Sequence, residues 1–460
     1  MATVQASKTV ETSQNARARL ILEDSKLLRQ TMVLLFYVCQ GFPLGLYLYA
    51  IPAWMAAAGA GTAQIATVVG ISQLPWSLKL VNGFLIDRYT FLPMGRRRAW
   101  IIGAQSLLVA SLLVSAVVSP LPTDIMLLAS LGFAASAATT FQDVAIDSLV
   151  IDIMPEEERM RASGTMFGAQ ILGISLATAA GGFLFSRIGF SGALALLATI
   201  PALVLLFGVM MRERAGERRL PWSRGKTHPR CREIQVEAWW PLLRNALRAL
   251  CAPLSLLLLP ILIVRALPHG GFEAFHPVLF TQTLGWRLED WTGFYSTVLL
   301  VSGVFGLLFG GRIVEKIGVQ RSLVLTTVGG AASLLAMGLA QPYWGIPGVA
   351  VSFVVVSEVW SMIFFIACIP LAMRMCGPAT AATQFTIYMA VSNFGRPLGA
   401  AIAGVTVGTG HPQWMYWGGA LSWLLAVAIL VLARFPQENA AEHAAAEVLP
   451  QGEGLAPTID

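Results

Sequence analysis

Ionisable side chains interrupt several of the longest apolar stretches of this 460-residue chain. Seven lie well inside such stretches, with one histidine beside them: Lys79, Asp143, Asp147, Arg265, Glu273, Glu358, Arg396 and His269. Facing lipid, each charge would cost roughly 3 kcal/mol, so we expect them to face a wet cavity or one another. Three cations and four acids predict partial pairing and leave an acid as a candidate proton carrier.

The stretch 124–150 predicts a helix with one polar stripe, because four polar residues recur at steps of four, three and four: Ser136, Thr140, Asp143 and Asp147. Gln142 lies about 100° away and is expected to contact a neighbouring helix. Lys79, at a comparable depth in the stretch 64–87, is the expected partner of Asp143 or Asp147. Two interpretations stay open here: a fixed ion pair that aids packing, and proton coupling through one of the carboxylates.

Two later stretches carry further polar residues. In 250–283, Pro268, Gly270 and Gly271 predict a break in the helix at mid-membrane depth, flanked by Arg265 and Glu273. The break either lines a cavity or is a packing kink with an Arg–Glu pair across it. His269 beside it either titrates or serves as a hydrogen-bonded structural residue.

The stretch 381–407 places Tyr388, Ser392 and Arg396 at steps of four, with Asn393 beside them. A guanidinium can grip a carboxylate or a phosphate with two hydrogen bonds, so Arg396 is a candidate anchor for an anionic solute. Glu358 is the alternative partner, which would neutralise it. In the stretch 31–56, Gln40 is a candidate hydrogen-bonding residue.

Other kinds of chemistry lack support. The segment ending in Gly225-Lys226-Thr227 has Leu220 where a phosphate-binding loop needs glycine, and His-Glu-x-x-His does not occur. The cysteines have no paired spacing: Cys39, Cys231, Cys251, Cys368 and Cys376. We therefore expect no metal, no cofactor and no catalytic residue; an intramembrane enzyme and a non-transporting sensor are the less favoured alternatives.

The elements that position these residues follow from composition. Hydrophobic residues make up 56% of the chain and charged residues 12%, about half the usual charged fraction of soluble domains. That excludes an ordinary soluble enzyme and a disordered chain. Because a membrane helix needs about 20 apolar residues, we predict an all-α integral membrane protein with twelve transmembrane helices. They are expected near 31–56, 64–87, 98–118, 124–150, 163–186, 190–211, 250–283, 291–313, 320–340, 344–374, 381–407 and 412–434.

The basic residues indicate the orientation. Of 31 Lys and Arg residues, 26 fall on one side of this topology, which predicts cytoplasmic termini and a cytoplasmic central loop. The net charge of +6 therefore reports topology and not a nucleic-acid partner. The predominance of Arg over Lys suggests a bacterial inner membrane. We expect five regions: a leader 1–30, a six-helix bundle 31–211, a basic linker 212–249, a second bundle 250–434 and a tail 435–460. Both the linker and the tail are predicted to be solvated or disordered.

A short motif occurs twice, 228 positions apart. The first copy reads Gly83-Phe-Leu-Ile-Asp87-Arg88 and is followed by Arg96, Arg97 and Arg98; the second contains Gly311, Glu315 and Lys316. Each copy follows the second span of a six-span half. The motif predicts a duplicated transporter with a tight helix approach at each glycine and an acid near a neighbouring helix N-terminus.

The motif resembles the cytoplasmic loop signature G-x-x-x-D-R-x-G-R-R of the major facilitator superfamily, with the turn lengthened by residues 89–94. In that superfamily the loop is a latch between the two halves. The resemblance therefore implies that the motif residues hold a gate and do not touch the solute.

Several segments together look like the AmpG-type muropeptide permeases and the related acetyl-CoA transporters: Gln40-Gly-Phe-Pro-Leu44, Pro75-Trp-Ser-Leu-Lys79, Gln142-Asp-Val-Ala-Ile-Asp147, Pro155-Glu-Glu-Glu-Arg159 and Ala382-Thr-Gln-Phe385. The resemblance implies a monomeric permease in the lipid bilayer that works by alternating access and takes up a bulky, anionic small-molecule solute, such as a muropeptide, with protons. A siderophore or a CoA thioester is the alternative, because the stretch 250–283 departs from the muropeptide permeases.

Overall fold

The computed structural model describes residues 20–233, 239–376, 381–433 and 435. Most of the predicted leader and nearly all of the predicted tail lie outside the described residues. Within them the regular secondary structure is helical, apart from two isolated β-bridges, and turns and loops connect the helices. The all-α prediction is therefore confirmed for the part of the chain that the structure describes.

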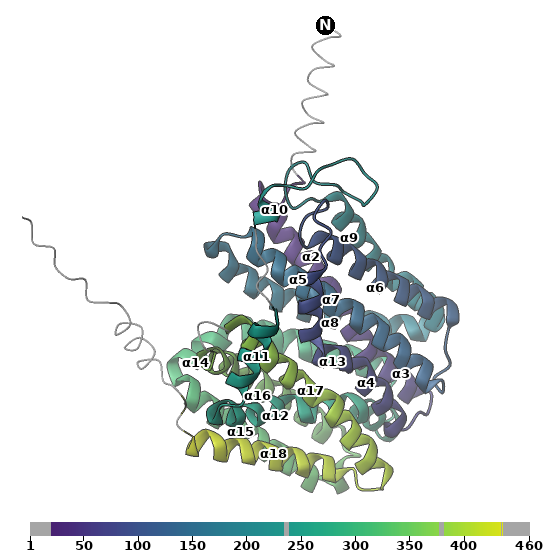
Figure 1. The fold of residues 1–460 in the computed structure, drawn as a ribbon. Helices are drawn as coiled ribbons and strands as arrows, with labels where there is room; N and C mark the ends of the chain where they lie inside the picture. Colours follow the sequence, from purple (N-terminus) through teal and green to yellow (C-terminus); the bar gives the residue numbers. More distant parts are fainter. Residues whose placement is uncertain (1–19, 234–238, 377–380, 434, 436–460) are drawn as a thin grey trace, which may run out of the picture.

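Most helices of the first half of the chain lie in the upper part of Figure 1 and most of those of the second half lie in the lower part, with the two halves side by side at mid-height. In chain order the helices of the first half are α2 (Lys26–Gly45), a π-helical segment (Leu46–Ala50), α3 (Ile51–Ala57), α4 (Thr62–Ser77), α5 (Lys79–Arg88), α6 (Arg98–Val118), α7 (Ile125–Ile153), α8 (Glu156–Leu197), α9 (Thr199–Met210) and α10 (Arg230–Glu233). The second half contains α11 (Trp239–Leu250), α12 (Pro253–Val278), a π-helical segment (Leu279–Thr283), α13 (Leu288–Phe305), a π-helical segment (Gly306–Gly310), α14 (Gly311–Ile317), α15 (Val319–Leu339), a 3₁₀ turn (Gln341–Tyr343), α16 (Pro347–Arg374), α17 (Ala381–Gly408) and α18 (Gln413–Leu432).

Nine helical stretches within the described residues are long and apolar enough to cross a membrane. One of them, Glu157–Met210, contains two of the predicted spans, and its helix bends at Gly189, where φ is +74°. The predicted spans 64–87 and 381–407 correspond to α4 with α5 and to α17, which are not among these nine. The chain is thus a multi-pass membrane protein.

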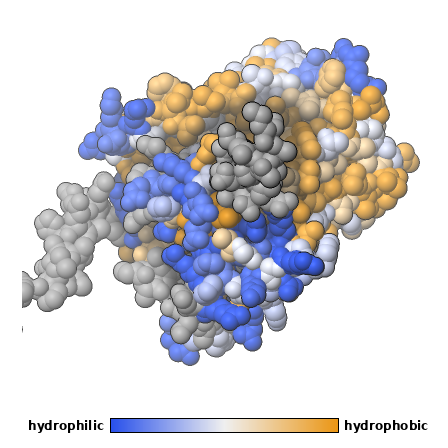
Figure 2. Space-filling model, turned by 90° about the horizontal axis from the view of Figure 1, so that it is seen from above, coloured by the Kyte–Doolittle hydropathy of each residue, from blue (hydrophilic) through white to orange (hydrophobic). Residues whose placement is uncertain are grey.

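The outer surface of the helices is apolar. Large hydrophobic side chains with more than half of their surface exposed occur on many of the helices, among them Val117, Leu203, Leu339 and Leu432. Seen from the end that carries α10, hydrophilic residues gather on that face and hydrophobic residues line the flanks (Figure 2). This distribution fits a bundle whose sides meet lipid and whose ends meet water.

The predicted break in the stretch 250–283 is wrong, because α12 runs without interruption through Pro268, Gly270 and Gly271. The glycines serve close packing instead. A Cβ on Gly270 would lie 1.9 Å from the carbonyl oxygen of Arg396, so only glycine lets α12 approach α17 here. Proline and glycine at these positions suggest a helix break from sequence alone. In the structure the glycines instead permit close contact with the neighbouring helix.

The first part of the predicted linker is also folded. Glu213, Arg214 and Glu217 are at most 2% exposed, and the backbone of Arg212 exchanges hydrogen bonds with Leu20 and Leu22. The prediction of a solvated or disordered linker is therefore wrong for these buried residues, whereas residues 221–230 are exposed or partly exposed. A high charge density does not require solvation here, because these charges have partners inside the protein.

Candidate functional site

A cation and two carboxylates lie together between α5 and α7. The ammonium of Lys79 forms an ion pair with Asp143, and its Nζ lies 3.6 Å from Oδ2 of Asp147. The side chain of Asp143 is only 5% exposed, whereas that of Asp147 is 40% exposed and that of Lys79 is 20% exposed. The predicted partnership is confirmed, and it places a buried acid next to a cation that water can reach.

A tyrosine that is not among the residues predicted from the sequence completes this cluster. Tyr37 of α2 donates a hydrogen bond from its hydroxyl to Asp147 and is 6% exposed. Gln40, three residues later on α2, accepts a hydrogen bond from Gln170 of α8 at 3.2 Å. Gln142 contacts a neighbour as predicted, because its Nε2 donates to the carbonyl oxygen of Phe36 at 3.1 Å. The spacing of Tyr37 and Gln40 on one helix face was a usable signal.

A second charged cluster lies between α12 and α17. Nη1 of Arg396 lies 3.4 Å from Oε1 of Glu273, whose side chain is 1% exposed. The same oxygen accepts a hydrogen bond from the hydroxyl of Tyr49 at 3.2 Å. Tyr49 belongs to the first half of the chain, so this contact joins the two halves. Tyr388 and Ser392, which the spacing places on one helix face with Arg396, both contact α12: the hydroxyls of Tyr388 and Ser255 lie 2.9 Å apart, and Ser392 donates to the carbonyl oxygen of Leu262 at 2.8 Å.

The third cluster pairs the histidine with the acid of α16. Nε2 of His269 lies 3.3 Å from Oε1 of Glu358, which also accepts a hydrogen bond from the hydroxyl of Tyr295 at 3.0 Å. The rings of Tyr295 and Tyr49 lie 4.8 Å apart between centroids. Two acids of the second half are therefore bridged by two tyrosines, one from each half.

Two pairings that the sequence left open, Arg265 with Glu273 and Glu358 with Arg396, do not occur in the part of the chain that the structure describes. Arg265 does not pair with Glu273, and Glu358 does not neutralise Arg396 within the ion-pair contacts of the described residues. Nε of Arg265 instead donates to Oγ of Ser361 at 2.7 Å. Helix periodicity predicts which face a residue occupies, but not which residue of the facing helix meets it.

The two halves also touch away from these charges. Nε2 of Gln282 donates to the carbonyl oxygens of Ala56 and Ala60 at 2.9 Å, which satisfies backbone acceptors at the end of α3. Nδ2 of Asn393 lies 3.5 Å from the carbonyl oxygen of Trp76 on α4. Both residues link the second half to the first.

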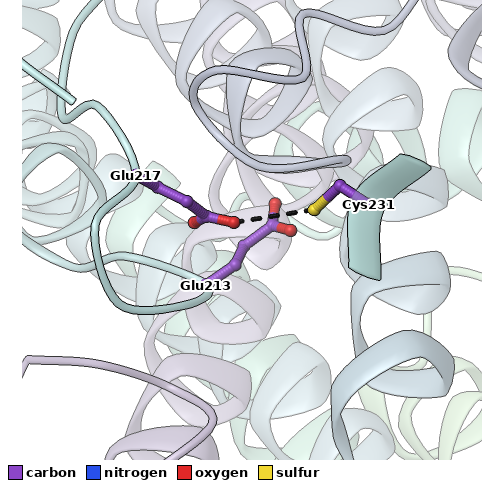
Figure 3. Close-up of side chains that lie close together, drawn as sticks. All are labelled: Glu213, Glu217 and Cys231. Atoms are coloured by element: carbon purple, nitrogen blue, oxygen red, sulfur yellow. Dashed lines mark hydrogen bonds between the residues drawn. The ribbon is translucent and has the colours of Figure 1, made fainter. Parts of the chain in front are cut away.

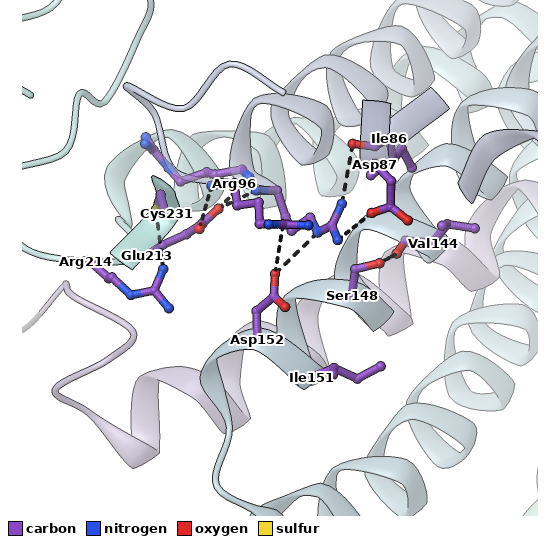
Figure 4. A network of polar contacts seen from close by, with 12 residues as sticks. Ile86, Asp87, Arg96, Val144, Ser148, Ile151, Asp152, Glu213, Arg214 and Cys231 are labelled. Atoms are coloured by element: carbon purple, nitrogen blue, oxygen red, sulfur yellow. Dashed lines mark hydrogen bonds and ion pairs between the residues drawn. The ribbon is translucent and has the colours of Figure 1, made fainter. Parts of the chain in front are cut away.

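The first copy of the repeated motif forms a network at the end of the molecule that carries α10 (Figure 4). Nη2 of Arg97 lies 2.6 Å from Oδ1 of Asp87, and Asp152 at the end of α7 lies 3.4 Å from Nε of Arg97 and 3.7 Å from Nε of Arg96. Arg88 is exposed. In this structure the motif therefore ties α5, α6 and α7 of the first half together.

An acid of the linker, missed from the sequence, holds the start of α6. The carboxylate of Glu213 accepts hydrogen bonds from the backbone N–H groups of Arg96, Arg97 and Arg98 at 2.7–2.8 Å. The guanidinium of Arg98 donates to five backbone carbonyls, including those of Arg218 and Arg219 at 2.6 Å. A carboxylate at a helix N-terminus satisfies free amides and the helix dipole together.

Glu213 lies beside Glu217 and Cys231, with one possible ligand atom from each within 4.8 Å of the others (Figure 3). Burial raises the pKa of Glu217 to about 7 and that of the Cys231 thiol to about 11. Both oxygens of Glu213 are taken by backbone amides, and Nη1 of Arg214 lies 3.5 Å from the sulfur. The amide hydrogens already occupy the carboxylate oxygens of Glu213, and the positive charge of Arg214 would repel a metal ion. We therefore interpret the cluster as the polar core of a folded loop.

The glycines of the repeated motif do not make the tight approaches that the sequence predicted. A Cβ on Gly83 would lie 4.0 Å from its nearest neighbour, an ordinary contact, and one on Gly311 would meet nothing within 4 Å. Glu315 and Lys316 on α14 are exposed. The close contacts lie elsewhere, as between α2 and α8, where a Cβ on Gly173 would lie 2.0 Å from the carbonyl oxygen of Val38.

Comparisons with known proteins agree with this architecture. A sequence model of the Major Facilitator Superfamily matches residues 33–400. An anhydromuropeptide permease of Escherichia coli K12 is 24% identical over 388 residues, covering 82% of this chain and 74% of the relative. A folate-biopterin transporter of Synechocystis is 24% identical over 417 residues, covering 87% and 78%.

A solved structure shows the same fold. It is the crystal structure of a bacterial homologue of the human lysosomal transporter Spinster, in an inward-facing and unoccupied conformation. It superposes with a TM-score of 0.60 at 16% identity and covers 89% of this chain and 96% of its own. Because the family model spans most of the chain and the fold is shared, this chain belongs to the major facilitator superfamily of membrane transporters, which are not enzymes.

Proposed function

We propose that the chain is a proton-coupled permease that takes up a bulky anionic solute by alternating access. The observation that carries this proposal is an ion pair deep inside each half, Lys79 with Asp143 and Arg396 with Glu273, in which the acid is buried and the cation is partly exposed. Buried charges are costly in a membrane and mark substrate and proton pathways in transporters. A tyrosine from the first half contacts the second pair, so relative movement of the halves would change its surroundings.

The proposed topology is twelve crossings in two six-helix bundles, 31–211 and 250–434, joined by the linker 212–249, with both termini in the cytoplasm and the chain working as a monomer. The positive-inside rule and the repeated motif support it. We infer an inward-facing state. Gln282 joins the halves at the proposed outer side, while Asp147 toward the cytoplasm keeps 40% of its side chain exposed.

An anhydro-muropeptide is the leading solute, supported by the Escherichia coli relative and by the segments that resemble muropeptide permeases. A folate-like compound is the second candidate, supported by the Synechocystis transporter. Both carry carboxylates, which suits a site with arginines. Siderophores and CoA thioesters remain alternative solutes, and each is tested in the uptake experiment below as a competitor of the labelled muropeptide.

The test is uptake of labelled anhydro-muropeptide into proteoliposomes, with and without an inward proton gradient. We expect accumulation above the equilibrium level only with the gradient, and its loss when a protonophore is added. Protein-free liposomes are the control. An absence of uptake by protein shown to be folded would remove this solute, after which excess folic acid, siderophore or CoA thioester would be tested for binding.

A further inference from the structure

Arg265 differs from the other two deep cations in what surrounds it. Lys79 is held by two aspartates and Arg396 by Glu273. Among the ion pairs of the described residues none includes Arg265, because Glu273 pairs with Arg396 and Glu358 with His269. Its side chain is partly exposed, so it borders space that water or a solute can enter. The two nearby acids, Glu273 and Glu358, are already engaged.

The geometry around Arg265 orients it without neutralising it. Its Nε donates to Ser361, and its guanidinium carbon lies 4.6 Å from the ring centroid of Phe365. Ser361 and Phe365 lie four residues apart on one face of α16. These two contacts hold the plane of the guanidinium, and they leave its two terminal nitrogens as donors on the far edge.

The charge of Arg265 needs a partner. An arginine without a carboxylate at ion-pair distance is costly at this depth in a membrane, and a flat guanidinium with two available nitrogens matches a carboxylate through two parallel hydrogen bonds. Arg396, the anchor suggested by the sequence, has already met this requirement with Glu273. The described contacts therefore single out Arg265 as the available cation.

We infer that Arg265 binds a carboxylate of the transported solute, held in position by Ser361 and Phe365, while Arg396 only positions Glu273. This inference rests on the proposed function, since it assumes that a solute enters between the halves. It goes beyond it by naming the group that selects an anion.

The first test needs no variant and no transport. The purified wild-type protein is treated with phenylglyoxal, an arginine reagent, and modified peptides are identified by mass spectrometry. We expect modification of Arg265 and protection of Arg396. Anhydro-muropeptide with free carboxylates should protect Arg265, whereas the same compound with amidated carboxylates should not. An unmodified Arg265 would overturn the inference, whatever the uptake assay shows.

The second test compares Arg265→Gln and Arg265→Lys in the uptake assay. Losing a charge-assisted pair should raise the half-saturating concentration of the free acid about tenfold to hundredfold in R265Q and less in R265K. The amidated compound should be affected little. The matched control is Arg187→Gln, because Arg187 is exposed and lies 5.5 Å from the ring of Phe183. That variant should behave as wild type.

The outcomes separate the two proposals. One outcome is that the wild-type protein takes up the muropeptide, that R265Q has the same half-saturating concentration, and that the muropeptide does not protect Arg265 from phenylglyoxal. This outcome would overturn the role of Arg265 and leave the permease function intact. If Arg265 is modified but no muropeptide is taken up, the proposed solute is wrong. Protection of Arg265 by folic acid would then support its role as an anion site. If none of the tested carboxylates protects Arg265, that role is refuted. If R265Q folds poorly, the role of Arg265 is judged from R265K and from the labelling of the wild-type protein.

Discussion

Removing the charge of Lys79 should destabilise the protein more than removing the charge of Asp143. Lys79 pairs with Asp143 and also lies 3.6 Å from Asp147. In Asp143→Asn the cation keeps its second carboxylate, whereas Lys79→Gln leaves two acids without their shared cation. Breaking a buried pair costs about 3–5 kcal/mol, so we expect Lys79→Gln within that range and Asp143→Asn below it. The double variant should recover much of the loss.

The assay is equilibrium unfolding in detergent micelles for the two single variants and the double variant, which together form a double-mutant cycle. The same proteins are then assayed for transport. If Asp143 carries the proton, Asp143→Asn abolishes gradient-driven accumulation and spares solute exchange. Strictly additive losses in the double variant would show that the pair is not coupled. Normal accumulation by Asp143→Asn would exclude that residue as the proton carrier.

Three further predictions concern Glu213, Glu217 and Gln282, which lie outside the charged clusters of the membrane helices. Glu213→Ala should lower the free energy of unfolding by about 2–4 kcal/mol, because three backbone amides lose their acceptor, and unchanged thermal unfolding would contradict this. Burial raises the pKa of Glu217 from 4.5 to about 7, so the folded loop binds this proton more tightly than the unfolded chain does. The stability of the loop should therefore fall as pH rises from about 4.5 to 7, and Glu217→Gln should weaken this dependence in hydrogen-exchange measurements, leaving the contribution of Glu213, whose pKa burial also raises. Gln282→Leu removes two hydrogen bonds worth about 1 kcal/mol each, and it should therefore favour separation of the halves at that end; an unchanged distance distribution between spin labels on α3 and α13 would refute this.

The amino-acid sequence by itself determined the class of protein and most of its helices. Hydrophobic stretches of membrane length depend only on local composition, so they could be located without knowing their neighbours. The polar stripe containing Asp143 and its pairing with Lys79 were also predictable, because both residues sit at similar depths on adjacent helices. The motif of Asp87 and Arg97 was recognised from its types and spacing, although its proposed role as a latch between the halves stays a prediction.

Only the tertiary structure decided which charges are paired and which one remains available. Arg265, His269 and Glu273 share one helix, yet each has a different partner on α16 or α17. Spacing along a helix determines the direction of a side chain, but the rotation and depth of the facing helix determine what it meets. For the same reason Glu213 looked like one charge in a solvated linker, although the fold places it against the free amides at the start of α6.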